Sequence, residues 1–396
     1  MNGRTLIPRA ALAATLFWPL PALADFQSFI NGLWPEAQRR GVPGAVFRQA
    51  FAGMKPEPEV LALTRKQPEF KQTSAQYIVK RVSQLRVDKG RQKAAEWGEV
   101  LEHIEASYGV DRYVVLAVWG NETNYGGFLG GHNALRAMAT LAYHGYRKDY
   151  FRKELLHALD ILAQGHTTPD NMVGSWAGAM GHTQFMPSSF KAYAVDITGD
   201  GRRDIWTTIP DALASTANYL KVHGWKPGQT WGYEVILPPG LHAARGQTLS
   251  IAEWEKRGVR RVRGQAFPRP TDQARLLLPA GPDGPALLVL PNFRVIKRYN
   301  NSDNYALAVG YLSDRIRGGD PFVTPWPIDQ LLDERERIEI QTRLNALGFA
   351  AGEPDGKLGP ASRAAISAFQ KATDTAVDGQ PTPDVLERLR AAAKNR

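Results

Sequence analysis

The sequence predicts a mainly α-helical protein that contains a small β insertion and ends in a three-helix domain. Over residues 25–225, apolar side chains recur at intervals of three and four, the period of amphipathic helices. Over residues 231–296 this pattern gives way to short apolar runs separated by Gly and Pro, which is typical of strands. Three prolines within residues 321–327 then separate the last part of the chain from the first.

The composition limits the class of protein. The 396 residues include 43% hydrophobic side chains, enough for about two or three domains and too many for a disordered chain. The absence of cysteine excludes disulfides, thiolate zinc sites, a cysteine nucleophile and a lipid-accepting cysteine. With 49 basic and 39 acidic side chains the net charge is +10, which favours an anionic partner such as nucleic acid, a membrane surface or an acidic polymer.

The N-terminus has the pattern of a cleavable secretory signal. Two arginines precede an apolar run over residues 10–18, and the small residues Ala22 and Ala24 follow it, so we expect a signal peptide over residues 1–24. An uncleaved anchor is the alternative, but a nine-residue run is too short to span roughly 30 Å of hydrocarbon. We therefore expect an exported, soluble protein with no membrane anchor. Export argues against nucleic acid as the partner and favours an extracytoplasmic polymer.

After the signal we expect a large domain over residues 25–320, a linker over residues 321–333 and a small domain over residues 334–396. In the small domain, Gly348 is placed to end one helix and Pro360 to begin the next. The expected strands are 233–237, 275–278 and 286–290, the helix that follows them is 303–317, and the helices of the small domain are 336–347, 360–371 and 383–392.

Glu122 is the candidate catalytic residue. The residues at 113–119 are apolar or aromatic on every side, which predicts a helix inside the domain, and Glu122 follows just before Gly126 and Gly127 end the element. Burial and the negative end of the helix dipole both disfavour a charged carboxylate there. We expect Glu122 to stay protonated close to neutral pH, as a general acid must. The alternative is a structural glutamate that pairs with an arginine or caps backbone groups.

The segment at 174–190 is the candidate sugar-binding segment. It has few charges but many small residues, hydroxyls, an amide and aromatic rings, which suits neutral hydrogen bonding to a sugar. Pro187 marks the start of a helix. The alternative is a tightly packed turn in which Met180, Phe185 and Met186 only fill the core.

The segment at 196–204 resembles a calcium-binding loop. Asp196, Thr198 and Asp200 take alternate positions, as in an EF-hand loop, and Asp211 is placed to close the site from further along the chain. Two departures are Thr207 at the twelfth position and two arginines within the loop. A metal-free turn is therefore the alternative to a structural calcium site.

Three motifs together resemble the membrane-bound lytic transglycosylase B family, over about residues 25–320. They are ETNYGG from Glu122, GAMGHTQFMPSS within residues 177–189, and RYNNSDNYALAVG at 298–310. The resemblance implies a fold like goose-type lysozyme and Glu122 as the sole catalytic acid and base. It also implies that the saccharide groove is lined by Ser175, Gln184, Phe185, Tyr219, Tyr299 and Asn300, with Arg147 and Tyr150 from the segment YRKDYF.

This resemblance implies non-hydrolytic cleavage of the β-1,4 bond between MurNAc and GlcNAc, with 1,6-anhydro-MurNAc ends as the product and no cofactor required. Within the groove, we expect Ser175 to orient the acetamido group. Gln184 and Asn300 would donate hydrogen bonds to polar edges of the sugar, and Tyr219 and Tyr299 would supply apolar contact. Two alternatives stay open. One is a hydrolytic muramidase that uses the same Glu122, and the other is a catalytically silent wall-binding protein.

The last part of the chain resembles the three-helix peptidoglycan-binding module. The motifs are LGF at 347–349, DGKLG at 355–359, AFQ at 368–370 and DG at 378–379. The expected partners are peptidoglycan glycan strands, with other cell-wall enzymes as further candidates. Because the chain lacks the lipid-accepting cysteine of the family's lipoproteins, we expect a free periplasmic enzyme.

Overall fold

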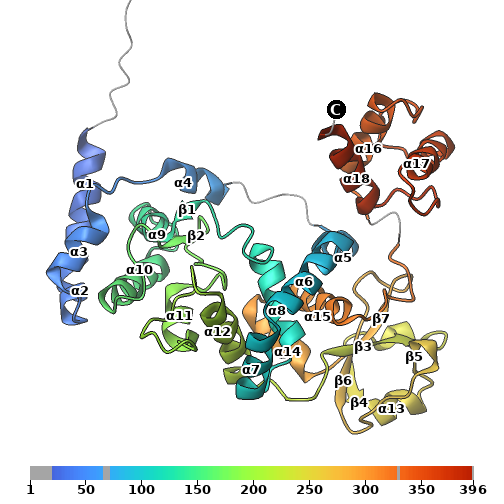
Figure 1. The fold of residues 1–396 in the computed structure, drawn as a ribbon, viewed down its shortest axis with the longest axis horizontal. Coiled ribbons are helices and arrows are strands. Elements are labelled where there is room, and N and C mark those ends of the chain that lie inside the picture. Colours follow the sequence, from blue (N-terminus) through green and yellow to red (C-terminus); the bar gives the residue numbers. More distant parts are fainter. Residues whose placement is uncertain (1–19, 66–71, 328–330, 395–396) are drawn as a thin grey trace, which may run out of the picture.

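The structure is a computed structural model that describes residues 20–65, 72–327 and 331–394 (Figure 1). It confirms the predicted class, a mainly helical protein with a small sheet and a separate helical domain at the C-terminal end. Three groups of buried apolar side chains form the cores of the helical body, the β insertion and the C-terminal domain. The predicted signal peptide lies outside the described residues up to position 19, and the first described helix begins at Leu20.

The centre of the helical body is α8 (Arg112–Thr123). Its side chains from Val114 to Trp119 are all buried, as the continuous apolar run predicts. The Asp111 carboxylate caps its start by accepting the N–H of Tyr113 at 2.9 Å, and Asn124 ends it in the left-handed conformation. The other helices of this body are α1 (Leu20–Asn31), α2 (Trp34–Arg39), α3 (Gly44–Phe51), α4 (Pro58–Arg65), α5 (Ser74–Arg81), α6 (Gln84–Glu96), α7 (Gly98–Tyr108), α9 (Ala134–Tyr143), α10 (Lys148–Ala163), α11 (Pro187–Tyr193), α12 (Ile209–Val222), α14 (Pro291–Tyr299) and α15 (Asp303–Arg317).

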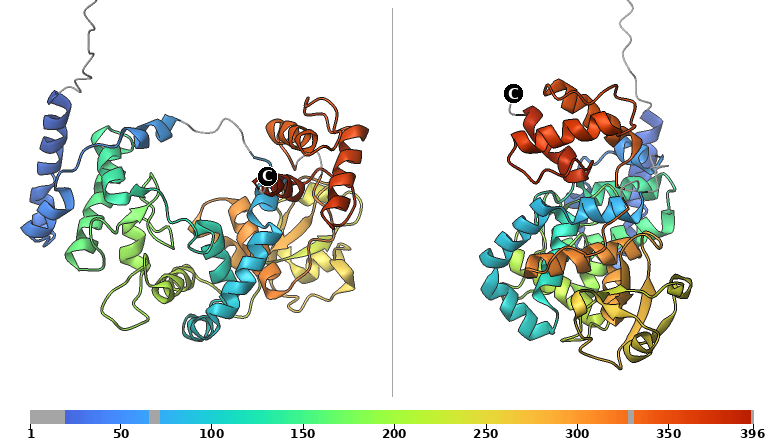
Figure 2. Two further views of the ribbon diagram at one scale, coloured as in Figure 1. Left: turned by 45° about the horizontal axis from the view of Figure 1, so that its top comes forward. Right: turned by 90° about the vertical axis from the view of Figure 1, so that its right-hand side faces the viewer.

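The β insertion, mostly yellow in Figure 2, is an antiparallel sheet. Its strand order is β4-β6-β7-β3-β5. The three expected strands are confirmed, and Trp254 fills the core beneath them. A short helix, α13 (Ile251–Lys256), is an addition to the prediction, although Ser250 and Glu253 form the capping box that signals it. The strands are β3 (Gly232–Ile236), β4 (Thr248–Ser250), β5 (Arg260–Arg261), β6 (Gln273–Leu277) and β7 (Ala286–Val289).

The proline-rich segment after α15 lies against the body of the protein. Phe322 stacks on Tyr311 with ring centroids 4.0 Å apart, and Glu234 accepts the N–H groups of Val323 and Thr324 at 2.8 and 2.7 Å. The C-terminal domain that follows has the three expected helices. They are α16 (Glu334–Ala346), α17 (Pro360–Ala372) and α18 (Pro383–Lys394).

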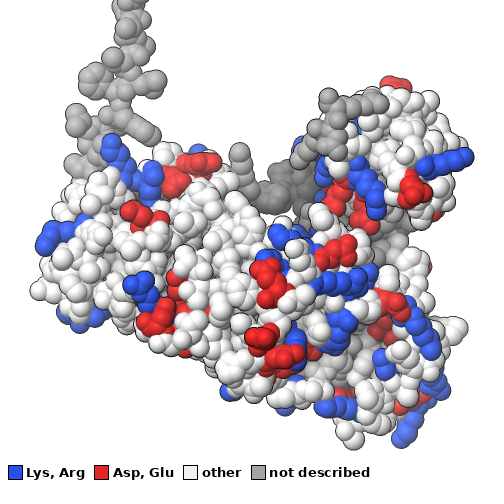
Figure 3. Space-filling model, in the orientation of Figure 1, with Lys and Arg blue, Asp and Glu red and all other residues white. Residues whose placement is uncertain are grey.

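On the face drawn in Figure 3, basic and acidic side chains are intermixed rather than gathered in one basic field. Within the described ranges, no helix is both long enough and apolar enough to cross a membrane.

Candidate active site

Glu122 lies in the last turn of α8 and has a hydrogen-bond partner from a distant helix. The Tyr305 hydroxyl, on the first turn of α15, donates to Glu122 Oε1 at 2.6 Å. Arg81, at the end of α5, donates to the carbonyl oxygen of the neighbouring Asn121 at 2.8 Å. Three helices therefore meet at this one carboxyl group.

Burial raises the pKa of Glu122 to about 7, even though the Tyr305 hydrogen bond and the positive charge of Arg81 both lower it. This result agrees with the pKa direction expected from the sequence. Within the part of the chain that the structure describes, Glu122 forms no ion pair, so the alternative of a structural pair with an arginine has no support. A carboxyl group with a pKa near 7 can donate a proton and take it back at neutral pH.

A cluster of aromatic side chains adjoins the carboxyl group. Tyr299 lies almost parallel to Tyr305, with ring centroids 6.4 Å apart, and donates to the carbonyl oxygen of Thr183 at 2.7 Å. Tyr219 contacts the Tyr299 ring at 4.8 Å. The buried Phe185 contacts both of these rings at 5.7 Å. The tertiary structure thus brings three residues predicted from separate segments next to Tyr305.

Tyr305 was not among the predicted site residues. The apolar spacing of the helix at 303–317 predicts only that Tyr305 faces the core, and it is indeed 3% exposed. Its hydroxyl reaches Glu122 because α15 packs against α8. The available signal was its place within the third motif, RYNNSDNYALAVG.

Backbone pairing joins the loop after α8 to the segment at 174–185. Strand β1 (His132–Asn133) pairs with β2 (Val173–Gly174). At Gly130, which has φ +118°, an added Cβ would lie 1.9 Å from the carbonyl oxygen of Gly174, so only glycine fits. The position of the sugar-binding segment relative to Glu122 is therefore fixed by backbone contacts.

Two of the predicted binding residues, Ser175 and Gln184, form hydrogen bonds with backbone groups of the segment at 174–185 or next to it. Ser175 Oγ accepts the N–H groups of Ala177 and Ala179 at 3.3 and 3.1 Å, which leaves the hydroxyl proton available. Gln184 Nε2 donates to the carbonyl oxygens of Leu129 and Gly181, both at 2.9 Å. In this structure the amide nitrogen of Gln184 is thus engaged within the protein and its Oε1, an acceptor, remains; donation by Gln184 to a sugar stays a prediction.

Three predicted residues remain, namely Asn300, Arg147 and Tyr150. Asn300 is exposed at the end of α14, next to Tyr299. The Arg147 guanidinium lies over the Tyr150 ring at 4.1 Å, at the start of α10. Among the described residues, no hydrogen bond or ring contact joins this pair to the Glu122 cluster.

The acidic loop brings together its three predicted carboxylates. Oxygens of Asp196, Asp200 and Asp211 lie within 4.8 Å of one another, and Thr198 Oγ1 lies 3.1 Å from Asp196 Oδ1. Asp211 is fully buried at the start of α12, and burial raises its pKa. A buried carboxylate beside two others fits a hard cation such as Ca²⁺.

The two departures from the EF-hand pattern have structural explanations. Arg203 turns away from the carboxylates, and its Nε donates to His166 Nε2 at 3.2 Å. The Thr207 hydroxyl donates to Asp204. Asp211, four positions after Thr207, supplies the third carboxylate of the cluster.

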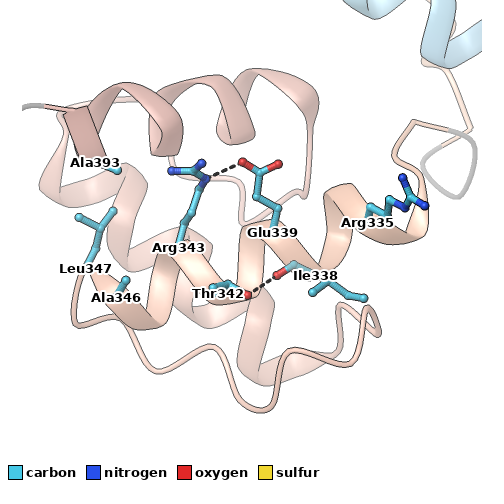
Figure 4. Close-up of a pocket in the computed structure, with 8 residues that line it drawn as sticks. All are labelled: Arg335, Ile338, Glu339, Thr342, Arg343, Ala346, Leu347 and Ala393. Atoms are coloured by element: carbon cyan, nitrogen blue, oxygen red, sulfur yellow. Dashed lines mark hydrogen bonds and ion pairs between the residues drawn. The ribbon is translucent and has the colours of Figure 1, made fainter. Parts of the chain in front are cut away.

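The C-terminal domain carries a hollow of about 620 Å³ on α16 and α18 (Figure 4). Its apolar surface comes from Ile338, Ala346 and Leu347, and Glu339 and Arg343 form an ion pair beside it at 2.6 Å. The hollow is open to solvent and combines an apolar floor with a charged edge.

A helical, lysozyme-like fold with a partly buried carboxylic acid of raised pKa, beside a loop that carries hydroxyl groups, is typical of enzymes that cleave polysaccharides with a single acid and base. The chain belongs to the transglycosylase SLT domain family, which matches residues 25–314. Residues 333–389 match the family of peptidoglycan binding domains. These matches confirm both resemblances found in the sequence.

Solved and curated relatives agree with this assignment. SltB3 from Pseudomonas aeruginosa, in complex with NAG-anhNAM-pentapeptide, is 45% identical, with a TM-score of 0.75 over 92% of this chain and 99% of that one. The lytic transglycosylase SLT35 from Escherichia coli, in complex with calcium, is 32% identical, with a TM-score of 0.63 over 74% of this chain and 92% of that one. Membrane-bound lytic murein transglycosylase B from Escherichia coli is 35% identical over 56% of this chain, and the match spans 61% of that relative's length.

Proposed function

We propose that this chain is a peptidoglycan lytic transglycosylase, which cleaves the MurNAc–GlcNAc β-1,4 bond without water and leaves 1,6-anhydro-MurNAc ends. The observation that carries the proposal is the single carboxyl group of Glu122, whose pKa of about 7 suits both acid and base catalysis. The family match and the anhydro-sugar fragment bound to the SltB3 relative support it.

In the first step protonated Glu122 donates its proton to the glycosidic oxygen. The bond between that oxygen and C1 of MurNAc breaks, and the GlcNAc unit leaves as an alcohol. Most glycosidases place a second carboxylate near C1, but substrate-assisted enzymes are exceptions. Here the substrate's own acetamido oxygen supports the positive charge at C1.

In the second step the Glu122 carboxylate takes the proton of the C6 hydroxyl, and O6 attacks C1 to close the anhydro ring. Glu122 is then protonated again and ready for the next bond. Tyr305 donates to Oε1 throughout, so the charged intermediate state keeps one hydrogen bond, and Oε2 faces the substrate. The reaction consumes no water, and the proton that Glu122 gives up in the first step is replaced by the one it takes in the second.

The remaining predicted groove residues have roles that follow from their free atoms. Ser175 has an unused hydroxyl proton with which it orients the acetamido oxygen. Asn300 is exposed and offers its amide to a polar sugar edge, while Gln184 offers Oε1 as an acceptor. Tyr299 and Tyr219 supply the apolar wall against a sugar face. Arg147 and Tyr150 bind further along the strand, outside the Glu122 cluster.

We also propose that the acidic loop holds a structural Ca²⁺ through Asp196, Asp200, Asp211 and the hydroxyl of Thr198. The support is the gathered carboxylates and the relative crystallised with calcium. The ion would stabilise the loop between α11 and α12 and would take no part in the proton transfers, which in this proposal Glu122 performs alone.

In this proposal the enzyme works in the periplasm after loss of residues 1–24.

The C-terminal domain holds the glycan strand or its peptides in the hollow on α16 and α18. Ala346→Trp, which fills the hollow, should weaken pelleting of the protein with purified sacculi. The matched control is Lys371→Met, which changes an exposed residue of α17 outside the hollow.

The decisive experiment is digestion of purified sacculi by the native protein and by Glu122→Gln, with product masses compared. We expect anhydro products from the native protein and almost none from the variant. Products one water heavier would indicate a hydrolytic muramidase. Binding without any soluble product would indicate a silent wall-binding protein. A variant as active as the native protein would show that Glu122 is not the catalytic acid.

A further inference from the structure

Helix α5 lies between the candidate active site and the C-terminal domain. Its residues Ala75 and Val79, one turn apart, pack into the hydrophobic core of the C-terminal domain, and Ala75 is fully buried there. Its residue Ile78, which neighbours Ala75 on the helix surface, is fully buried in the core of the helical body, and Tyr77 packs against that core from the side away from Ala75. A short amphipathic helix with two apolar faces joins the two domains.

An ion pair fixes the C-terminal side of this contact. Lys80 Nζ lies 2.5 Å from Glu336 Oε1. Glu336 is 7% exposed, and its Oε2 accepts the N–H of Asp333 at 3.0 Å in the capping box of α16. One carboxylate therefore caps α16 and holds α5. The carboxylate side of this pair is buried, whereas the Lys80 side chain is 36% exposed, so water screens the pair in part.

The opposite face of α5 contacts the candidate active site. Arg81 follows Lys80 in the chain and donates to the carbonyl oxygen of Asn121, the residue before Glu122. Arg86 Nη1 donates to the carbonyl oxygens of Lys80 and Arg81 at 3.0 and 2.9 Å, which completes the end of the helix. The charge of Glu122 also acts on Tyr77, one of the side chains by which α5 packs against the helical body. Movement of α5 would therefore change the surroundings of Glu122 directly.

We propose that Lys80 and Glu336 are positioning residues for Glu122: docking of the C-terminal domain on α5 holds Arg81 and Tyr77 in place and keeps water away from the carboxyl group. The C-terminal domain thus contributes to proton transfer as well as to wall binding. The catalytic part of this inference rests on the proposed function, whereas its structural part does not.

The test uses the full chain with Lys80→Met and, separately, Glu336→Gln, which loses the charge but keeps an oxygen to cap α16. The first readout is the pKa of the Glu122 carboxyl group, measured by NMR titration and assigned with Glu122→Gln. The groups that face Glu122 are Tyr305, Tyr299, Tyr77 and Arg81. Loosening α5 would admit water, which lowers the pKa, and would move the Arg81 charge away, which raises it. Because burial is the largest influence and Arg81 the smallest, the pKa should fall, by about one unit.

The second readout is turnover of a purified soluble GlcNAc–MurNAc tetrasaccharide, with binding to sacculi measured in parallel. A fall of about one unit in a pKa near 7 reduces the protonated fraction at pH 7 about fivefold, so kcat should fall by that factor with KM unchanged. The control is Glu36→Gln on α2. It removes the ion pair between Glu36 and Arg152 of α10, away from α5.

The outcomes separate the two proposals. If both variants keep the native pKa of Glu122, the positioning role is wrong, whatever the enzyme's activity. If the pKa shifts but the native protein releases no anhydro product, the positioning role holds and the proposed function fails. Reduced sacculus binding with an unchanged pKa would show that the contact serves wall attachment alone.

Discussion

The Glu122 site and the acidic loop use the same functional group in opposite surroundings. Glu122 lies apart from other carboxylates in a partly buried position, with the Tyr305 hydroxyl as its hydrogen-bond donor, and desolvation raises its pKa to about 7. Asp196 lies beside two other carboxylates and accepts the N–H groups of Gly199 and Gly201 at 2.7 and 2.8 Å. Slight desolvation acts to raise the pKa of Asp196, but these N–H groups and the Thr198 hydroxyl outweigh it and lower the pKa.

This difference shows how the surroundings decide what a carboxyl group can do. A partly buried carboxyl group with one donor exchanges protons near neutral pH. A carboxylate that is supplied with several backbone donors, as Asp196 is, is favoured in its charged form, which suits binding of a cation. The following predictions test this contrast, from the largest expected effect to the smallest.

Glu122→Gln should lower kcat by about a thousandfold, because it removes both the acid and the base. Asp200→Asn, which changes a carboxylate of the acidic loop, should keep most of the activity. Product formation from a soluble muroglycan measures both. Equal losses in the two variants would remove the functional distinction between the sites.

Tyr305→Phe should lower the maximal rate about tenfold and move the alkaline limb of the kcat profile to higher pH. The hydroxyl stabilises the charged form of Glu122, so its loss raises the pKa of that carboxyl group further. Tyr219→Phe removes a hydroxyl that bonds to the Arg298 carbonyl oxygen, and it should leave the limb in place. A limb that moves to lower pH in Tyr305→Phe would contradict the assigned role.

Calcium should raise the Tm of the native protein by about 3–5 °C at saturating concentrations, and a chelator should reverse the change. Asp211→Asn should abolish this response, because Asp211 is the buried member of the cluster. Asp170→Asn, an exposed aspartate outside the loop, serves as the control. No change in Tm with calcium or chelator would support the metal-free turn.

Glu122→Gln should also be more stable than the native protein at pH 8, by a few degrees in Tm. The folded-state pKa of Glu122 lies above its ordinary value of 4.5, so the native protein loses stability as pH rises from about 4.5 through about 7. The difference between the two proteins should therefore disappear near pH 4. Calorimetry at several pH values tests this, and a constant difference across the range would contradict the raised pKa.

Much of the fold could be predicted because its signals are local. The apolar run at 113–119 specifies a buried helix, and the helix expected at 303–317 matches α15 at both ends. The three main strands also follow from short apolar runs between turn residues. The small helix α13 was missed because its six residues are too few to display a helical period.

The site was only partly predictable, because side-chain roles depend on contacts between distant segments. Gln184 was expected to donate to a sugar, but its amide nitrogen donates to the carbonyl oxygens of Leu129, in the loop after α8, and Gly181, in its own segment. Arg147 and Tyr150 contact each other instead of the Glu122 cluster. Neither result could be deduced from spacing, since spacing does not say which backbone carbonyl will lie nearby.

The sequence by itself determined that one carboxyl group would end a buried helix, because continuous apolar residues and the end of the helix are encoded within a few neighbouring positions. Only the tertiary structure decided which groups surround that carboxyl. Tyr305 comes from 183 positions away, and α5 brings Arg81 beside Asn121. Hydrogen bonds and desolvation act over a few ångströms, so the proton affinity of Glu122 is set by packing between helices that the local sequence does not specify.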